Sequence, residues 1–166
     1  MNTAHWHLVL NHFPIIGTMV TGFFLTIAII NKNKGMIVSS YCILFFLSII
    51  AFIVNQTGEG AEEAVESLAE INKWALHEHE EFAETSIIIH IVTGVMALIG
   101  FILTMVKKVA SRLMSVVILL STYITIGFMS YTGYLGGQIR HTEVNGKTQT
   151  DQRNNINNEP SSEEDD

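Results

Sequence analysis

Four long stretches of the sequence consist of apolar and small polar residues and contain no Asp, Glu, Lys or Arg. A helix rises about 1.5 Å per residue, so each stretch is close to the roughly 20 residues that cross a bilayer core. The pattern predicts an all-α, polytopic membrane protein, a four-transmembrane-helix bundle with both termini on one side. The predicted spans are Phe13–Ile30, Met36–Val54, Ser86–Val106 and Leu113–Leu135.

The segment between the second and third stretches has a different pattern. From Ala61 onward, apolar residues recur at three- and four-residue spacings, as on an amphipathic helix. We expect this helix over residues 61–84, on the outer face, with the third span beginning near Ser86. The turn Asn31–Gly35 should make the first two spans antiparallel neighbours. The apolar face of the outer helix consists of Ala61, Val65, Leu68, Ala75 and Phe82.

Composition agrees with this class, because 48% of the residues are hydrophobic and the mean hydropathy is +0.34. The Asn-, Gln- and Glu-rich residues 145–166 show no periodicity and are expected to form a disordered tail. The transmembrane domain should therefore occupy residues 1–144. The single Cys42 lies within a predicted span, which excludes an internal disulfide and a metal site built from several cysteines.

The basic residues predict the orientation, because Lys and Arg in short loops are retained in the cytoplasm. The residues before the first span carry no Lys or Arg, and residues 55–85 carry only Lys73. We expect the chain in a bacterial inner membrane with both termini in the periplasm. The net charge of −7 then lies mainly outside, which argues against nucleic acid as a partner. The loop cations are Lys32, Lys34, Lys107, Lys108 and Arg112.

This orientation places all seven histidines on or near the outer side. Helical phase separates two of them: His79 falls on the apolar face of the outer helix, whereas His77 is turned about 160° away, among glutamates. His90 follows His79 by eleven residues and points nearly the same way if the helix is continuous. An ionisable residue inside a membrane is a candidate functional residue. The alternative is a neutral His90 hydrogen-bonded to a Ser or Thr.

Further polar residues flank the first and last spans. Asn11–Pro14 resembles a helix start, since proline is tolerated in a first turn, and it places His12 at the mouth of the first span. His7 precedes it by five residues. At the other end of the domain, Arg140, His141 and Glu143 stand where the last span leaves the membrane.

Four segments together resemble a bacterial family of four-span membrane proteins known as domain of unknown function 2231. The resemblance covers nearly everything from His7 to Val144. It implies the same four-span fold but no settled activity. Some members are joined to cytochrome-c-like modules, which implies redox partners. The segments are His7–Ile15, Thr57–Glu63, His79–Glu81 and Gly136–Glu143.

The residue types favour a b-type haem protein that transfers electrons at the periplasmic face, with a periplasmic cytochrome or another membrane redox subunit as partner. Haem needs axial ligands at matched depth, and pairs of imidazoles are a common solution. Arg140 would meet a propionate. The candidate haem-binding residues are His12, His79, His90, His141 and Arg140.

Two alternatives stay open. Imidazoles with carboxylates also suit a zinc, iron or copper ion, with His7, His12, His79, Glu80, His141 and Glu143 as candidate ligands. Alternatively, the polar residues form hydrogen bonds that hold a structural or partner-binding subunit together without any cofactor. No serine or cysteine stands in a recognisable nucleophile setting, so nothing indicates a hydrolase or transferase.

Overall fold

The computed structural model describes residues 3–58, 60–62, 72–107 and 111–139, which are helical and include no strand. Four helices are long and apolar enough to cross a membrane, the first of them including α1 and α2. Each contains one of the four apolar stretches, as an all-helical multi-pass membrane protein requires. The expected tail, 145–166, lies outside the described residues. The elements are α1 (Thr3–Leu10), α2 (His12–Ile30), α3 (Lys34–Gln56), α5 (Lys73–Lys107) and α6 (Arg112–Gln138).

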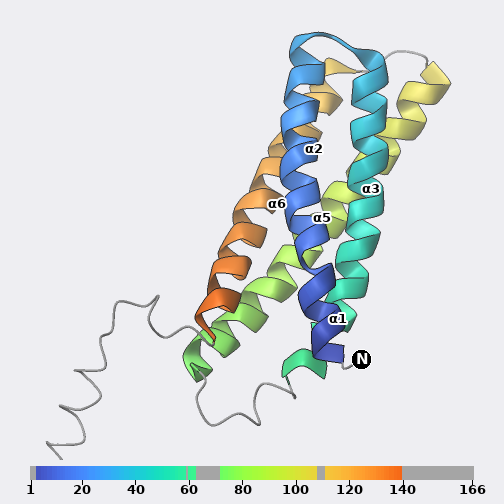
Figure 1. Ribbon diagram of the computed structural model, residues 1–166. Coiled ribbons are helices and arrows are strands. Elements are labelled where there is room, and N and C mark those ends of the chain that lie inside the picture. Colours follow the sequence, from blue (N-terminus) through green and yellow to red (C-terminus); the bar gives the residue numbers. More distant parts are fainter. Residues whose placement is uncertain (1–2, 59, 63–71, 108–110, 140–166) are drawn as a thin grey trace, which may run out of the picture.

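The long helices pack side by side, and each contacts two neighbours (Figure 1). Both α2 and α5 lie against α3 and α6, while α1 packs at one end against α2 and α3. The turn from α2 to α3, the end of α5 and the start of α6 lie at the opposite end. We call this the basic end, for Lys32, Lys34, Lys107 and Arg112, and we call the α1 end the imidazole end, for His5, His7, His12, His77 and His79.

The turn between α2 and α3 is as tight as expected. Lys32 has a φ of 51°, the left-handed conformation in which helices often end. The Lys32 N–H donates to the carbonyl of Ile29 at 3.3 Å, and the Asn33 N–H donates to the carbonyl of Ala28 at 2.9 Å. The Asn33 side chain then caps α3 by accepting from the Met36 N–H at 3.1 Å. These bonds satisfy groups that both helix ends would otherwise leave unpaired.

The interior contains small and polar residues, whereas many large apolar side chains face outward. Thr93 and Thr122 are fully buried, but Phe23 is 61% exposed and Ile88 is 62% exposed. This distribution suits helices surrounded by lipid, where burying apolar groups between helices gains little. We call the buried stripe of α5 the seam; its members alternate at four- and three-residue spacings, and they are Ser86, His90, Thr93, Ala97, Gly100 and Thr104.

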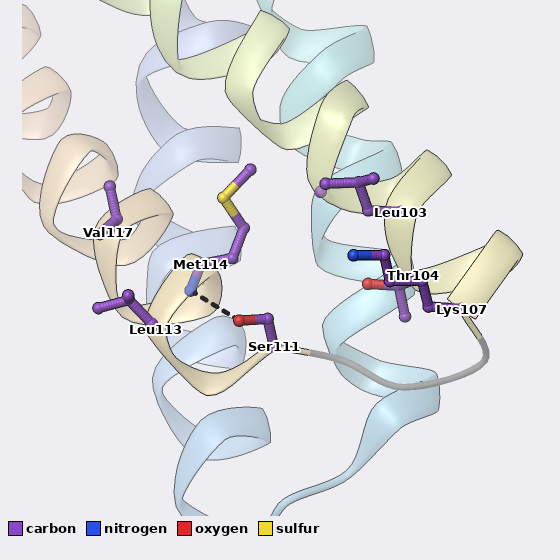
Figure 2. Close-up of a pocket in the computed structure, with 8 residues that line it drawn as sticks. Leu103, Thr104, Lys107, Ser111, Leu113, Met114 and Val117 are labelled. Carbon is purple, nitrogen blue, oxygen red and sulfur yellow. Dashed lines mark hydrogen bonds between the residues drawn. The ribbon is translucent and has the colours of Figure 1, made fainter.

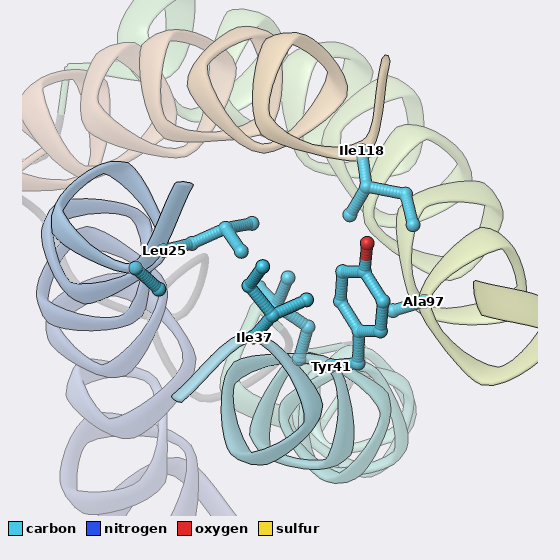
Figure 3. Packing of buried hydrophobic residues seen from close by; sticks show 7 residues of the cluster. Leu25, Ile37, Tyr41, Ala97 and Ile118 are labelled. Atoms are coloured by element: carbon cyan, nitrogen blue, oxygen red, sulfur yellow. The ribbon is translucent and has the colours of Figure 1, made fainter. Parts of the chain in front are cut away.

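Larger apolar residues fill the interior toward the basic end (Figure 3). Leu25 of α2 and Ile118 of α6 are fully buried there, facing Ile37 and Tyr41 of α3. The phenol of Tyr41 reaches across to α6 and donates to the hydroxyl of Ser115 at 2.8 Å. The basic end is therefore held by apolar packing around one buried hydrogen bond.

The expected outer helix over 61–84 is wrong in its continuity, because Asn72 is not helical. Its side chain accepts from the Ala75 N–H at 3.1 Å, which caps the start of a new helix. That helix is α5, which runs unbroken for 35 residues through Ser86, where a separate third span was expected to begin. Residues 63–71 lie outside the described residues.

The first span also begins earlier than expected. The residue Asn11 has helical φ and ψ, and its N–H donates to the carbonyl of His7 at 3.0 Å. Asn11–Pro14 was predicted to begin the first helix, but Asn11 is only a single residue between α1 and α2. As a result His12 lies within a longer helical stretch, His5–Ile30, instead of at its mouth.

The closest approach of α3 and α5 gives a test of this packing. A Cβ added at Gly94 would lie 2.1 Å from Oγ and 2.4 Å from Cβ of Ser48, so backbone would have to move. We expect Gly94→Ala to lower the free energy of unfolding by about 1–3 kcal/mol, the usual cost of overpacking. Thermal unfolding in detergent would measure this.

Gly127→Ala is the matched control, because nothing lies within 4 Å of a Cβ there. Alanine has the higher helix propensity, so this control should be neutral or more stable by up to about 1 kcal/mol. Equal effects of the two substitutions would contradict the described packing of α3 on α5.

Candidate functional site

The inward orientation expected for His79 is found in the structure. Its Nδ1 lies 2.8 Å from the carbonyl oxygen of Thr132 on α6. A carbonyl only accepts, so Nδ1 carries the proton and Nε2 keeps a free lone pair. A Cβ added at Gly136 would lie 3.1 Å from Cε1 of this ring, so the glycine makes room for the imidazole.

His7 of α1 has the same protonation pattern. Its Nδ1 lies 3.2 Å from the carbonyl oxygen of Val54 and 3.1 Å from the hydroxyl of Thr57. The Thr57 hydroxyl itself donates to Val54 at 2.7 Å, so both oxygens accept from the imidazole. Nδ1 of His7 therefore carries the proton, and its Nε2 lone pair is also free.

These two imidazoles form the candidate site. A charge on His79 would disfavour a charge on His7, which is consistent with both rings lying at the imidazole end. They come from α1 and α5, and each is oriented by a carbonyl of a further helix, α3 or α6. An N–H bond from Nδ1 to a backbone carbonyl is the arrangement that commonly fixes an imidazole for coordination through Nε2.

His12 and His77 do not join this pair. His12 is exposed, and its Nδ1 bonds within its own helical stretch, to the carbonyl of Leu8 at 3.0 Å. Its side chain is thus occupied locally, although its Nε2 is also left as the acceptor. His77 is 70% exposed and lies 3.6 Å from Glu81, on the solvated face where helical phase placed it.

His90 is fully buried in the seam, between α5 and α2. Its Nε2 lies 3.3 Å from the hydroxyl of Thr18, and that hydroxyl donates to the carbonyl of Pro14 at 2.6 Å. Nε2 must therefore carry the proton, the opposite tautomer to His7 and His79. This hydrogen bond is the kind expected in the alternative interpretation of His90, a neutral imidazole bonded to a Ser or Thr. The Nδ1 atom of His90 is buried and has no hydrogen-bond partner among the residues that the structure describes.

The remaining predicted ligands are not brought together within the described residues. Glu80 is half-buried and follows His79 directly, so it projects from α5 about 100° further round. Arg140, His141 and Glu143 lie outside the described residues. Within the ranges that the structure describes, no group of three or more His, Cys, Asp or Glu side chains could hold a metal ion.

Comparison of the chain with protein-family models, with curated proteins and with solved structures found no match. The resemblance to the 2231 family therefore remains a prediction from the four sequence segments.

Sequence reasoning grouped His79 with His12 and His141 and missed the partners that orient it. One signal was available: His7 and His12 are five residues apart, so on one helix they point about 140° apart and cannot both face the interior. Nothing in the sequence indicated that the hydroxyl and carbonyl of Thr132 would contact Ser86 and His79. These contacts are identified only once α5 and α6 are packed together, where Ser86 lies 2.9 Å from the Thr132 hydroxyl.

The tautomers can be measured directly. In protein labelled with ¹⁵N-histidine at a pH where the imidazoles are neutral, we expect His7, His12 and His79 to carry the proton on Nδ1. His90 should carry it on Nε2. Nitrogen chemical shifts distinguish the two forms, and single His→Gln variants assign the signals. An Nε2–H form for His79 would contradict its bond to Thr132.

Proposed function

We propose that the protein is a b-type haem protein of a membrane, with His7 and His79 as the axial pair. The observation that carries this proposal is that two imidazoles of the imidazole end have their Nδ1 protons committed to Val54, Thr57 and Thr132. Both Nε2 lone pairs are therefore available, and two imidazoles are the set that a six-coordinate haem iron takes from a protein.

The surroundings of the pair support this donor set. A Cβ at Gly58 would lie 3.8 Å from Cε1 of His7, and Gly136 stands beside His79, so backbone without side chains flanks both rings. Haem bound there would supply one-electron transfer. The protein's own part would be to orient the imidazoles through Val54 and Thr132 and to fix their tautomers. A periplasmic cytochrome or a membrane redox subunit is the proposed partner.

A non-haem zinc, iron or copper ion is a weaker proposal for the same residues. Zinc sites usually use three or four protein ligands, whereas no group of three or more His, Cys, Asp or Glu side chains in the described residues could hold a metal ion. Two of the predicted ligands, His141 and Glu143, lie outside the described residues.

A structural role is supported by the same hydrogen bonds. The bond from His79 joins α5 to α6, and the bond from His7 joins α1 to α3. Each stabilises a helix contact by about 0.5–1.5 kcal/mol without any cofactor. The same bonds are therefore compatible with a subunit whose imidazoles only hold the helices together.

The membrane arrangement is part of the proposal. We place the imidazole end at the periplasmic face of a bacterial inner membrane, as a four-helix bundle, because the cations gather at the other end. Aromatic side chains support an interface at the imidazole end, since Tyr and Trp favour the boundary between lipid and water. Phe82 packs edge-on against Tyr131 at 4.6 Å between ring centres, and Trp74 is 59% exposed.

Spectroscopy tests the haem proposal. Protein expressed with added haem and purified in mild detergent should show a Soret band and sharpened bands on reduction. His79→Ala and His7→Ala should each lose or alter these bands, because each removes an axial ligand. His77→Ala is the matched control and should leave the spectrum unchanged. A colourless preparation would exclude haem, and elemental analysis of that sample would then separate a metal ion from a purely structural role.

The orientation in the membrane can be tested with single cysteines that are introduced into the Cys42→Ala variant. Lys73→Cys lies at the start of α5 and Asn31→Cys in the turn after α2, and both positions are exposed. A maleimide that cannot cross membranes should label the first in spheroplasts and the second only after lysis. The reverse pattern would place the imidazole end in the cytoplasm.

A further inference from the structure

A pocket of about 360 Å³ lies between α5 and α6 at the basic end, far from the imidazole pair (Figure 2). Its volume is within the range of small-molecule sites. Leu103 comes from α5, and Met114 and Val117 come from α6, so most of the wall is apolar. In Figure 2 the side chain of Lys107 extends toward the space between the helices, on the side of Ser111.

The polar groups of this pocket are suited to an anion. Lys107 contributes an ammonium group. The Ser111 hydroxyl, which caps α6 by accepting from the Met114 N–H at 3.4 Å, can donate its own proton. The N–H groups of Arg112 and Leu113 have no acceptor within the helix, and the helix dipole makes that end positive. No Asp or Glu occurs in the sequence between Glu84 and Glu143, so no carboxylate of α6 or of the seam competes for this charge.

The apolar part of the pocket opens onto the outer surface of the helices. Leu113 is 75% exposed and Leu103 is 42% exposed, and both also line the pocket. In a membrane this surface contacts acyl chains. A ligand at this position therefore meets a cation at the membrane boundary and apolar walls that continue into the lipid, which is the chemistry of a phospholipid.

We propose that this pocket binds one anionic glycerophospholipid, with its phosphate at Lys107 and the start of α6 and an acyl chain along Leu103, Met114 and Val117. Basic pockets between membrane helices at the cytoplasmic side recognise acidic headgroups in this way. The inference depends on insertion in a membrane and is independent of whether haem binds at the other end.

Native mass spectrometry of delipidated protein tests the proposal. Dioleoyl phosphatidylglycerol should bind more tightly than dioleoyl phosphatidylcholine, which has the same chains but no net charge. Lys107→Gln should weaken the binding of phosphatidylglycerol roughly fivefold, the effect of one cation near an anionic lipid. Val117→Trp, which fills the apolar wall, should weaken binding of the same lipid without changing the charge.

Lys73→Gln is the matched control, since Lys73 is an exposed cation at the imidazole end, and it should bind like the unaltered protein. Circular dichroism would confirm that each variant is folded. Equal affinities for the two lipids, or equal effects of Lys107→Gln and Lys73→Gln, would overturn the proposal. Displacement of the lipid by excess inorganic phosphate would also overturn it, because the site would then recognise the phosphate alone.

Discussion

The contact between α3 and α5, where Gly94 lies directly against Ser48, sets how closely the four helices approach. Among lipid chains, helices gain little by burying apolar groups, so they associate through close packing and hydrogen bonds. Small residues of α5 permit that approach, and its hydroxyls form hydrogen bonds both within the helix and to α6. Thr93 bonds to the carbonyl of Ile89 at 2.9 Å, and the Thr125 hydroxyl lies 3.0 Å from that of Thr93. With α5 held at this distance, its outer turns meet α6 at Thr132.

The imidazole end follows from this packing. His79 reaches Thr132 only because α5 continues as one helix beyond Ser86, and His7 reaches Val54 only because α1 folds against the end of α3. Each bond ties two helices together and also fixes which ring nitrogen carries the proton. Removing either histidine therefore removes a bond between two helices.

The four spans, the tight turn at Lys32 and the opposite orientations of His77 and His79 could be predicted from sequence, because each depends on local composition or on helical phase. The bonds of His7 to Val54 and of His79 to Thr132 could not, since they depend on which helices are neighbours and how far each extends. The start of α5 after Asn72 was not predicted. The apolar spacing continues across this position, and the helix cap is made by a single side chain. The pocket beside Lys107 likewise depends on the packing of α5 against α6.

The length of α5 has a mechanical consequence. Its 35 residues extend over about 50 Å, well beyond a hydrocarbon core of roughly 30 Å, without a proline to bend it. His79 near one end and Lys107 at the other therefore belong to one continuous helix. If this helix tilts as a rigid body so that His79 moves away from Thr132, its distance from the start of α6 at Ser111 changes as well. The imidazole end and the basic end are thus connected through one continuous helix, which lies against Ser48 of α3 at Gly94.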